Sequence, residues 1–313
     1  MKASDNERTL ITGAGGMVGG SIADLARNAG WQVFTPSSKD LDLRDSKATL
    51  DFLLDYKIDS VIHCAARVGG IAANIAAPAD FILDNLQIDA SLASTARRLR
   101  VKNFLYFGSS CMYPKTTLQP MQINQILTSS LEPTNEGYAL SKISGAKTVS
   151  AIAQQDSLNW RVLIPSNLYG PRDNFDPLTS HLIPAVIHKI HSAIESNQEL
   201  IEIWGDGKAR REFTFVGDLA EFVVLNFYKI RTWPEMLNVG YGSDYSVNEY
   251  YRAIAEELRF TGKFDHNLEK PVGMKQKLMD SSVARLYGWN PTTDLKTGIK
   301  KTIEWFMENL TNE

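Results

Sequence analysis

The sequence predicts an α/β protein built on a doubly wound parallel sheet, with a smaller α/β lobe towards the C-terminus. Short apolar runs alternate with helical patterns over the first 170 residues, as in successive βαβ units. A glycine-rich turn separates the first run from the first helical pattern. Further on the alternation loosens, without a flexible linker. We expect a first domain over residues 1–170 with a return segment at about 214–240, and a second domain from residues 171–213 and 241–313.

The composition is that of an ordinary globular protein of 313 residues. Hydrophobic residues make up 43% and charged residues 22%, and the formal net charge is -3. This balance does not indicate a nucleic-acid groove or a membrane-binding face, so an anionic small ligand must be bound by local cationic groups. The two cysteines, Cys64 and Cys111, are too few for a disulfide framework and form no CxxC pair for zinc.

The sequence also predicts a location in the reducing cytoplasm. Residues 1–8 lack the apolar core of a signal peptide. No run reaches the roughly 20 apolar residues that a membrane helix needs. The low cysteine count is consistent with the same compartment.

The glycine-rich turn near the N-terminus is the first candidate ligand site. Gly13, Gly16 and Gly19 lie between the apolar run 9–12 and a helical pattern over residues 17–28. Such glycines permit close approach of the backbone to a pyrophosphate, and the helix N-terminus supplies free N–H groups. We expect a Rossmann-type dinucleotide site; a glycine-rich turn without a ligand is the alternative. The predicted cofactor contacts here are Gly13, Gly16, Met17, Val18 and Gly19.

The end of the second apolar run, residues 32–35, distinguishes the two nicotinamide cofactors. A site for NAD usually has an Asp or Glu at this point, which binds the ribose hydroxyls. This chain instead continues through Ser38 and Lys39, and hydroxyls with a lysine suit a 2′-phosphate better. We therefore expect NADPH, with Asp42 and Leu43 near the adenine. The alternative is that Lys39 is a solvated loop lysine.

Further strands and helices complete the first domain. His63 and Cys64 lie within an apolar run and are expected to be packed rather than chemically active. A long loop over residues 115–136 has little apolar periodicity, and loops of this length in a compact domain tend to be functional. The expected elements are a helix over 45–57, a strand over 60–64, a helix over 78–99, a strand over 104–107, a helix over 138–155 and a strand over 160–165.

Ser109 and Cys111 directly follow the strand expected over residues 104–107. In an open α/β sheet, ligands bind at the carboxyl ends of the strands, so a hydroxyl and a thiol at this edge are candidate site residues. Taken alone, the serine could simply form a turn and the cysteine could be a small buried hydrophobe.

Tyr138 and Lys142 are four residues apart at the start of an expected helix, so their side chains share one helix face. A neighbouring ammonium favours the phenolate, and we therefore expect Lys142 to lower the pKa of Tyr138. The pair is common as a structural feature. After a dinucleotide-binding βαβ unit, it indicates proton transfer by the tyrosine.

The second domain is expected to contain fewer regular units. His181 enters a helix rich in alanine, isoleucine and histidine, and Asp218 is expected to be the N-cap of a later helix. The other expected elements are a strand over 201–204 and helices over 247–258 and 295–307.

Several further segments carry recognisable motifs, namely 65–71, 108–115, 131–136, 167–171, 173–175, 204–207 and 211–213. Together with the glycines and the Tyr138–Lys142 pair, they resemble the extended short-chain dehydrogenase/reductase family, and within it the GDP-L-fucose synthases. The resemblance extends from about residue 10 to residue 305. A generic nucleotide-sugar epimerase would share the glycines, Tyr138 and Lys142. It would not be expected to share the Ser-Cys stretch, His181 and the Asp-Asn-Phe segment together.

The resemblance implies NADPH-dependent 3,5-epimerisation and C4 reduction of GDP-4-keto-6-deoxy-D-mannose to GDP-L-fucose. It implies that Cys111 is the base and His181 the acid that exchange the protons at C3 and C5 beside the ketone. It implies that Tyr138 protonates the new alkoxide, that Lys142 tunes Tyr138 and holds the nicotinamide ribose, and that Ser109 hydrogen-bonds the C4 oxygen. Cysteine and histidine both exchange protons near neutral pH, which suits these roles.

The same resemblance implies the remaining binding residues. Arg211 has a better claim to the pyrophosphate than Arg210, and Trp204 could either stack on guanine or simply pack. The implied cofactor contacts, besides those above, are Tyr138, Lys142, Pro165, Asn167, Leu168 and His181. The implied GDP-sugar contacts are Asn167, Leu182, Lys189, Trp204, Arg211 and Lys277.

Alternatives to this function remain. Gln122 and Val272 stand where the family commonly has an acid, which leaves room for another GDP-4-keto sugar such as a 6-deoxy-heptose or a 3,6-dideoxy-hexose. Such an enzyme could epimerise one carbon only, or none. A non-catalytic NADPH-binding regulator is disfavoured, because Tyr138 and Lys142 are both present. The resemblance also implies a homodimer that pairs through the helices beginning at Pro78 and near Tyr138.

Overall fold

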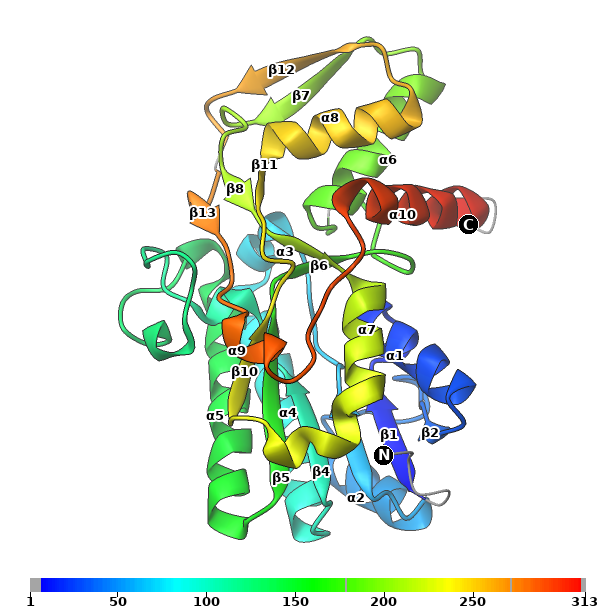
Figure 1. Cartoon of the computed structure of the whole chain (residues 1–313), viewed down its shortest axis with the longest axis vertical. Helices are drawn as coiled ribbons and strands as arrows, with labels where there is room; N and C mark the ends of the chain where they lie inside the picture. Colours follow the sequence, from blue (N-terminus) through cyan, green and yellow to red (C-terminus); the bar gives the residue numbers. More distant parts are fainter. Residues whose placement is uncertain (1–6, 178, 271, 311–313) are drawn as a thin grey trace.

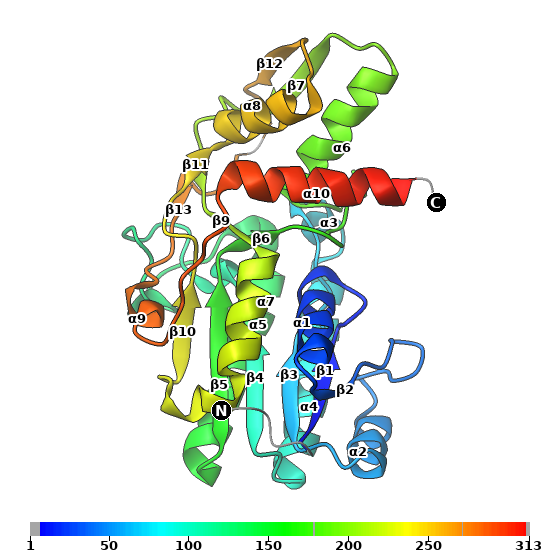
Figure 2. The same cartoon turned by 45° about the vertical axis from the view of Figure 1, so that its right-hand side comes forward.

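The computed structural model describes residues 7–177, 179–270 and 272–310. Figures 1 and 2 show an elongated molecule, with a parallel sheet and its covering helices in the lower part and a smaller lobe above. Residues 1–6, within the segment for which the sequence predicts no signal peptide, lie outside the described residues. Within the part of the chain that is described, no helix is both long and apolar enough to cross a membrane.

The main sheet has six parallel strands in the order β10-β5-β4-β3-β1-β2. The chain builds outward from β1 to β2 and then crosses over to β3, so the order reverses between β1 and β3. In doubly wound sheets the crevice at this switch point binds the ligand. The strands are β1 (Arg8–Thr12), β2 (Gln32–Phe34), β3 (Ser60–His63), β4 (Asn103–Phe107), β5 (Asn159–Pro165) and β10 (Met236–Val239).

Helices cover both faces of this sheet, as Figure 2 shows. On one face, α1 (Met17–Asn28) packs beside α7 (Val216–Asn226). On the other face lie α2 (Ser46–Asp55), α4 (Pro78–Arg98) and α5 (Glu136–Asp156). Each face has its own apolar core, because successive side chains along a buried strand point alternately to the two sides. This confirms the predicted fold class.

The second lobe packs three helices around a third apolar core. Its helices are α6 (Leu182–Glu195), α8 (Val247–Leu258) and α10 (Leu295–Asn309). A parallel pair, β7 (Leu200–Trp204) and β12 (Lys263–Asn267), covers them at the top of Figure 1. A small sheet of β11 (Tyr245–Ser246), β8 (Arg210–Arg211) and β13 (Gln276–Lys277) lies nearer the main sheet.

The chain crosses between the lobes more than once. β6 (Asn167–Tyr169) leaves the main sheet, and β9 (Phe213–Phe215) pairs with it and leads back into α7. After η4 (Phe227–Thr232), β10 adds the last strand of the main sheet. On this topology we propose the division expected from the sequence, in which a segment at about 214–240 returns to the first domain.

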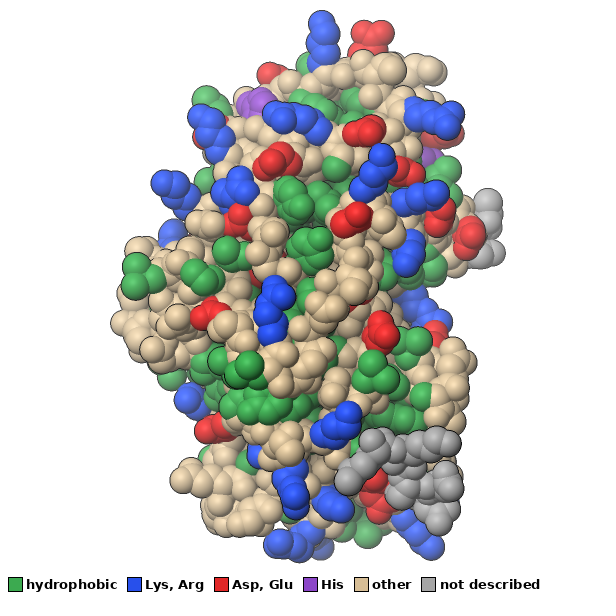
Figure 3. All heavy atoms as spheres, viewed as in Figure 1, with side chains coloured by type: hydrophobic (Ala, Val, Ile, Leu, Met, Phe, Trp, Pro, Cys, Tyr) green, Lys and Arg blue, Asp and Glu red, His purple; other side chains and the backbone are tan. Residues whose placement is uncertain are grey.

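The remaining short elements lie in loops. They are α3 (Ile71–Ala76), the 3-10 turns η1 (Ser110–Met112), η2 (Ile123–Gln125) and η3 (Pro133–Asn135), and α9 (Ser282–Arg285). On the face shown in Figure 3, basic and acidic side chains are interspersed rather than gathered into a patch of one sign. This distribution matches the near-neutral net charge of -3.

The prediction that Asp218 is an N-cap is wrong. Helix α7 begins at Val216 with Phe215 as its N-cap, which places Asp218 inside the first turn. Its carboxylate instead accepts hydrogen bonds from the backbone N–H and the hydroxyl of Thr293, at 3.0 and 2.8 Å. A contact 75 residues away along the chain therefore replaced the local capping bond that the sequence pattern favoured.

Candidate active site

A cleft of about 1460 Å³ lies between the carboxyl ends of the main strands and the second lobe. Pockets for one small ligand are usually about 300–1,000 Å³, so this cleft has room for two. It brings together every site residue expected from the sequence except Lys39. The lining includes Gly13, Gly16, Met17, Val18, Gly19, Ser38, Asp42, Leu43, Ser109, Cys111, Tyr138, Lys142, Pro165, Asn167, Leu168, His181, Leu182, Lys189, Trp204, Arg211 and Lys277.

The glycine-rich turn forms one end of the cleft. Gly13 has a φ of +68°, a conformation that favours glycine, and a Cβ there would lie 2.8 Å from the backbone nitrogen of Ala65. The N–H of Gly16 donates to the carbonyl of Gly13 at 3.0 Å, which closes the turn just before α1 begins at Met17. No acidic side chain occupies the first turn of α1. The free N–H groups of this helix start can therefore receive an anionic group.

Beyond β2 the cleft is lined by Ser38, whereas Lys39 is exposed and lies outside the lining. The role of Lys39 at a 2′-phosphate therefore stays a prediction. The cleft adds a cation that the sequence reasoning missed, Arg44. Its guanidinium pairs with Asp42 at 2.8 Å and with Asp84 at 3.3 Å. The sequence indicated Arg44 only through its position, two residues after the expected cofactor contact Asp42.

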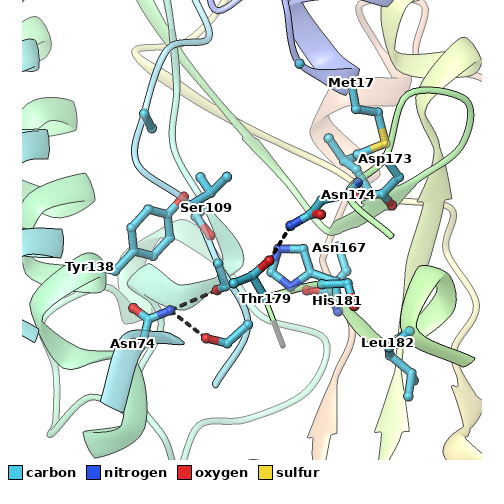
Figure 4. A pocket seen from close by; sticks show the side chains of 18 of the residues that line it. Met17, Asn74, Ser109, Tyr138, Asn167, Asp173, Asn174, Thr179, His181 and Leu182 are labelled. Atoms are coloured by element: carbon cyan, nitrogen blue, oxygen red, sulfur yellow. Dashed lines mark hydrogen bonds between the residues drawn. The ribbon is translucent and has the colours of Figure 1, made fainter. Parts of the chain in front are cut away.

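Ser109 and Tyr138 meet in the cleft, and Figure 4 shows the hydroxyl of the tyrosine directed at the serine. Ser109 follows β4 and caps η1, accepting from the N–H of Cys111 at 3.3 Å. Burial raises the pKa of Tyr138, as do the nearby Cys111 and Asp89, while a hydrogen bond with Ser109 acts in the opposite direction. The sequence predicted a lowered pKa, and this prediction is wrong. Desolvation of the phenol, together with the charges of Cys111 and Asp89, outweighs the hydrogen bond with Ser109.

Lys142 is buried one helical turn further along α5. Its ammonium donates to the carbonyl of Phe107 at 3.0 Å and lies 4.7 Å from the centre of the Tyr106 ring. Burial lowers the pKa of Lys142, and the charges of Asp89 and Cys64 partly oppose that effect. The lysine is thus fixed against β4, with its charge next to buried groups of the first domain.

Cys111 is held by two groups from different parts of the chain. The side-chain amide of Asn135 donates to its sulfur at 3.1 Å, and the ammonium of Lys277 lies 4.0 Å from the same atom. Hydrogen-bond donors and cations around a cysteine favour the reactive thiolate. The sequence reasoning placed Lys277 at the substrate and missed Asn135. The sequence indicated Asn135 only through its position in the motif 131–136, immediately before α5.

His181 is the N-cap of α6 and faces the cleft from the second lobe, opposite Ser109 and Tyr138 in Figure 4. Its ring is accessible to solvent from within the cleft, although the walls of the cleft surround it. Desolvation by these walls and the positive charge of Lys277 both lower the pKa of His181. The cleft therefore combines Cys111, a proton-exchanging side chain on the main sheet side, with His181 from the second lobe.

The far end of the cleft, within the second lobe, is lined by Leu182, Lys189 and Trp204. The ammonium of Lys189 donates to the carbonyl of Glu202 at 2.5 Å. Trp204 remains 44% exposed, its indole N–H donates to the Glu202 carboxylate at 3.0 Å, and the ammonium of Lys270 lies 5.4 Å from its ring centre. An indole with an open face can stack on an aromatic ligand.

Arg211 lines the same end, whereas Arg210 lies outside the lining. The guanidinium of Arg210 is bound to Asp244 at 2.8 Å and lies 3.6 Å from Glu249. Within the described residues, Arg211 donates to backbone carbonyls alone, those of Arg210 at 2.8 Å and Val272 at 3.0 Å. Among the described contacts, its charge has no carboxylate partner within 4.0 Å, which favours Arg211 over its neighbour for an anionic ligand.

Asp173 is an additional ionisable group of the cleft, next to Met17 in Figure 4. It belongs to the Asp-Asn-Phe segment, in which Asn174 donates to the Thr179 hydroxyl at 2.8 Å. Burial raises the pKa of Asp173 to about 7, against a hydrogen bond from the N–H of Asn174. Its other carboxylate oxygen is buried and has no hydrogen-bond partner among the described residues. Asp173 is thus positioned to contact a bound ligand.

Comparison with known proteins gives the family. The model of the NAD dependent epimerase/dehydratase family matches residues 9–240. The chain belongs to this family. A GDP-L-colitose synthase from Yersinia pseudotuberculosis is 44% identical over 98% of this chain and 100% of that protein. A GDP-L-fucose synthase from Azorhizobium caulinodans is 41% identical over 96% of each.

Solved structures show the same similarity. A GDP-mannoheptose C4 reductase from Campylobacter jejuni, solved with NADP bound, superposes with a TM-score of 0.88 at 29% identity. The match covers 97% of this chain and 99% of that one. These findings confirm the predicted resemblance to the extended short-chain dehydrogenases/reductases over nearly the whole chain. Within the described residues, no group of three or more His, Cys, Asp or Glu side chains could hold a metal ion.

Proposed function

We propose that this protein is an NADP(H)-dependent epimerase and reductase that converts GDP-4-keto-6-deoxy-D-mannose to GDP-L-fucose. The observation that supports it best is the meeting of Ser109, Cys111, Tyr138, Lys142 and His181 in one cleft, next to a dinucleotide-type glycine turn. The family match and the GDP-sugar enzymes among its relatives support the same chemistry. The volume of the cleft, about 1460 Å³, allows the cofactor and the sugar nucleotide to bind together.

Epimerisation is assigned to Cys111 and His181. The C4 ketone acidifies the protons at C3 and C5, so a thiolate can remove each one to give an enolate. The donors on the sulfur, Asn135 at 3.1 Å and Lys277 at 4.0 Å, favour the thiolate that this step requires. His181, from the second lobe, then returns a proton to the other face of the ring.

Reduction is assigned to Ser109, Tyr138 and Lys142. NADPH supplies the hydride to C4 when it is bound along the glycine turn. Ser109 and Tyr138 orient the C4 oxygen, and Tyr138 gives it a proton. The raised pKa of Tyr138 suits this direction of transfer, because the phenol is protonated at neutral pH and can act as the donor. Lys142 holds the nicotinamide ribose beside it.

The GDP moiety is assigned to the second lobe. Lys189 and Arg211 offset the charge of its pyrophosphate, and Trp204 offers an open aromatic face to guanine. Leu182 and Asn167 complete this end, and the cofactor end includes Pro165 and Leu168.

The direct test is to incubate the purified protein with GDP-4-keto-6-deoxy-D-mannose and either NADPH or NADH, following absorbance at the wavelength of the reduced nicotinamide. We expect NADPH to be consumed with the sugar present and NADH to be consumed much more slowly. An absence of consumption with either cofactor, in protein that binds NADPH, contradicts the proposal.

A second candidate is a related enzyme on another GDP-4-keto sugar. The relative at 44% identity is named as a GDP-L-colitose synthase, and the structural neighbour at 29% as a mannoheptose C4 reductase. Val272, one of the two positions that depart from the family pattern, lines the cleft. Gln122, the other, binds Asp280 at 3.2 Å on the outside. A panel of hexose, 3,6-dideoxy-hexose and heptose substrates, with the stereochemistry of each product, distinguishes the candidates.

We also propose that the enzyme is a cytoplasmic homodimer that pairs through α4 and α5. These two long helices pack against each other on one face of the main sheet. Their outer surface carries exposed apolar side chains, including Leu83 at 56% and Leu140 at 38% exposure. Sedimentation equilibrium is expected to give twice the chain mass, and a monomer at micromolar concentration contradicts this assembly.

A further inference from the structure

A chain of buried polar side chains lies behind Lys142, in the core of the first domain. Asp89, on α4, occupies its centre. One carboxylate oxygen of Asp89 is 3.0 Å from Nε2 of His63 on β3, and the other accepts from the hydroxyl of Tyr106 on β4 at 2.6 Å. All three side chains are buried, with exposures of 6%, 1% and 1%. None of the steps assigned above uses any of them.

The chain continues to the glycine turn through Thr12, the last residue of β1. The hydroxyl oxygen of Thr12 accepts from the backbone N–H groups of Cys64 and Ala65 at 3.1 and 3.0 Å. It also lies 2.8 Å from Nδ1 of His63. With its oxygen accepting two bonds, the hydroxyl donates its proton to Nδ1, so Nε2 carries the ring proton and donates to Asp89. Each bond in the chain thus has a defined direction.

The other end of the chain reaches Lys142 through Tyr106. The ammonium of Lys142 lies 4.7 Å from the centre of the Tyr106 ring, in the geometry of a cation–π contact. The negative charge of Asp89 favours the charged form of the lysine, against the effect of burial. Burial also raises the pKa of Asp89, but the hydrogen bond from His63, the charge of Lys142 and the hydrogen bond from Tyr106 outweigh it and lower the pKa.

The neighbouring backbone is shaped to fit this cluster. Gly145 lies on α5, three residues after Lys142, and a methyl group there would overlap the Asp89 carboxylate and the Tyr106 hydroxyl. Apolar side chains of similar volume could fill such a core at no loss of stability. A buried carboxylate with complete partners, next to a glycine that leaves room for it, is instead suited to hold a charge in place.

We propose that Asp89 is a positioning residue for the reduction: through Tyr106 it keeps Lys142 charged and in place, and through His63 and Thr12 it couples the lysine to the cofactor turn. The part that concerns C4 reduction rests on the proposed function, whereas the part that concerns NADPH binding needs only the cofactor.

The first experiment measures the dissociation constant of NADPH against pH for the wild type and for Asp89→Asn. The groups that act on Lys142 are Asp89 and Cys64, through their charge, and Tyr106, through its ring, and Asp89 has the largest charge effect of these. Removing that charge lowers the pKa of the ammonium. As pH rises and the lysine loses its proton, NADPH binding should weaken. We expect this weakening to begin in Asp89→Asn at a pH at least about one unit lower than in the wild type. Superimposable pH profiles overturn the proposal.

A matched control is Asp156→Asn. Asp156 is likewise a helix carboxylate with a partner, Arg97 of α4 at 2.6 Å, but this pair lies at the C-terminal ends of α4 and α5, away from Lys142. A shift that appears in Asp89→Asn and not in this control separates the proposed role from simple helix packing. If Asp89→Asn does not fold, Tyr106→Phe removes the hydrogen bond while keeping the ring, and a smaller shift in the same direction is expected.

The second experiment uses the sugar substrate and compares two rates in the same variant. We expect NADPH oxidation by Asp89→Asn to fall about tenfold or more, while deuterium uptake from solvent without NADPH stays within about twofold of the wild type. Equal loss of both rates in folded protein overturns the proposal. If the wild type itself fails to reduce the sugar, the proposed function fails, and the NADPH-binding profiles still decide the role of Asp89.

Discussion

Two buried carboxyl groups, one in each region of the molecule, respond to burial in opposite ways. Asp89 lies in the first domain among His63, Tyr106 and Lys142, and these partners lower its pKa despite burial. Glu212 lies in the second domain and is fully buried, and among the described residues its carboxylate accepts from the backbone N–H groups of Gly242 and Met279, at 2.6 and 2.8 Å.

Burial raises the pKa of Glu212 to about 7, because those two hydrogen bonds do not offset the loss of water. The difference shows that nearby cations and side-chain donors, rather than depth, decide whether a buried carboxyl stays charged. The site itself also has two halves. The reduction half is built from β4 and α5 of one domain, while the exchange half joins η1 to α6 and β13 of the other.

The largest expected effect separates these halves by chemistry. Tyr138→Phe removes the proton donor for reduction, and we expect NADPH oxidation to fall about 10²–10⁴-fold while deuterium uptake in the absence of NADPH continues.

Cys111→Ser removes the proposed base for epimerisation. We expect the rate of deuterium uptake at C3 and C5 to fall about 10²–10⁴-fold. Full uptake by Cys111→Ser rules that cysteine out as the base.

Glu212→Gln tests the contrast between the carboxyls through stability. The folded pKa of Glu212 is raised from 4.5 to about 7, so its contribution is fully present below pH 4.5 and is lost as pH rises through about 7. Between pH 5 and pH 8, the wild type should therefore lose stability relative to the variant, by up to about 3 kcal/mol. Asp89→Asn should show no such change between pH 5 and pH 8, because the lowered pKa of Asp89 makes its contribution fully present above 3.8 and lost only as pH falls below that value. Chemical denaturation at pH 5 and pH 8 measures both gaps, and a pH-independent gap between the wild type and Glu212→Gln contradicts the contrast.

Asn135→Ala tests the support of the thiolate on the exchange side. Its amide donates to Cys111 but makes no capping bond to α5, so the helix should tolerate the change. We expect deuterium uptake to slow about tenfold with NADPH affinity unchanged. Asn124→Ala, at an exposed position in the same loop, is the control. Unchanged uptake would show that the sulfur needs no donor from this residue.

The smallest expected effect is a pH shift on His181. Lys277 lowers the pKa of His181, so Lys277→Met should raise it. A proton donor loses activity as pH rises through its pKa. In the wild type, the rate of deuterium uptake should therefore fall as pH rises through the pKa of His181. In Lys277→Met we expect this fall to occur at higher pH, by less than about one unit. Lys275→Met, an exposed neighbour, should leave the profile in place. A shift to lower pH contradicts the assignment.

The sequence was sufficient for features that depend on local pattern. The glycine turn, the strand ends that carry Ser109 and Cys111, and the helix face shared by Tyr138 and Lys142 follow from spacing alone. These features define the fold and the centre of the cleft, whereas the residues of the second lobe, such as Lys189, Trp204 and Arg211, were expected only from the family resemblance.

Features that depend on packing between distant segments were not predicted. Asp89 meets His63 and Tyr106 only when α4 packs across the sheet, and Asn135 meets Cys111 from 24 residues away. The pKa of Tyr138 was expected to fall because the sequence shows a neighbouring charge but not desolvation. Asp218 accepts a hydrogen bond from Thr293, 75 residues away, and does not cap its own helix.

The central claim, that one cleft performs both proton exchange and reduction, is tested most directly by the isotopic content of the product. The protein is incubated in D₂O with GDP-4-keto-6-deoxy-D-mannose and NADPH, and the sugar is analysed by NMR. We predict GDP-L-fucose with deuterium at C3 and C5 and protium at C4. A reduced sugar that keeps protium at C3 and C5 would contradict the account, because it identifies a reductase without epimerase activity.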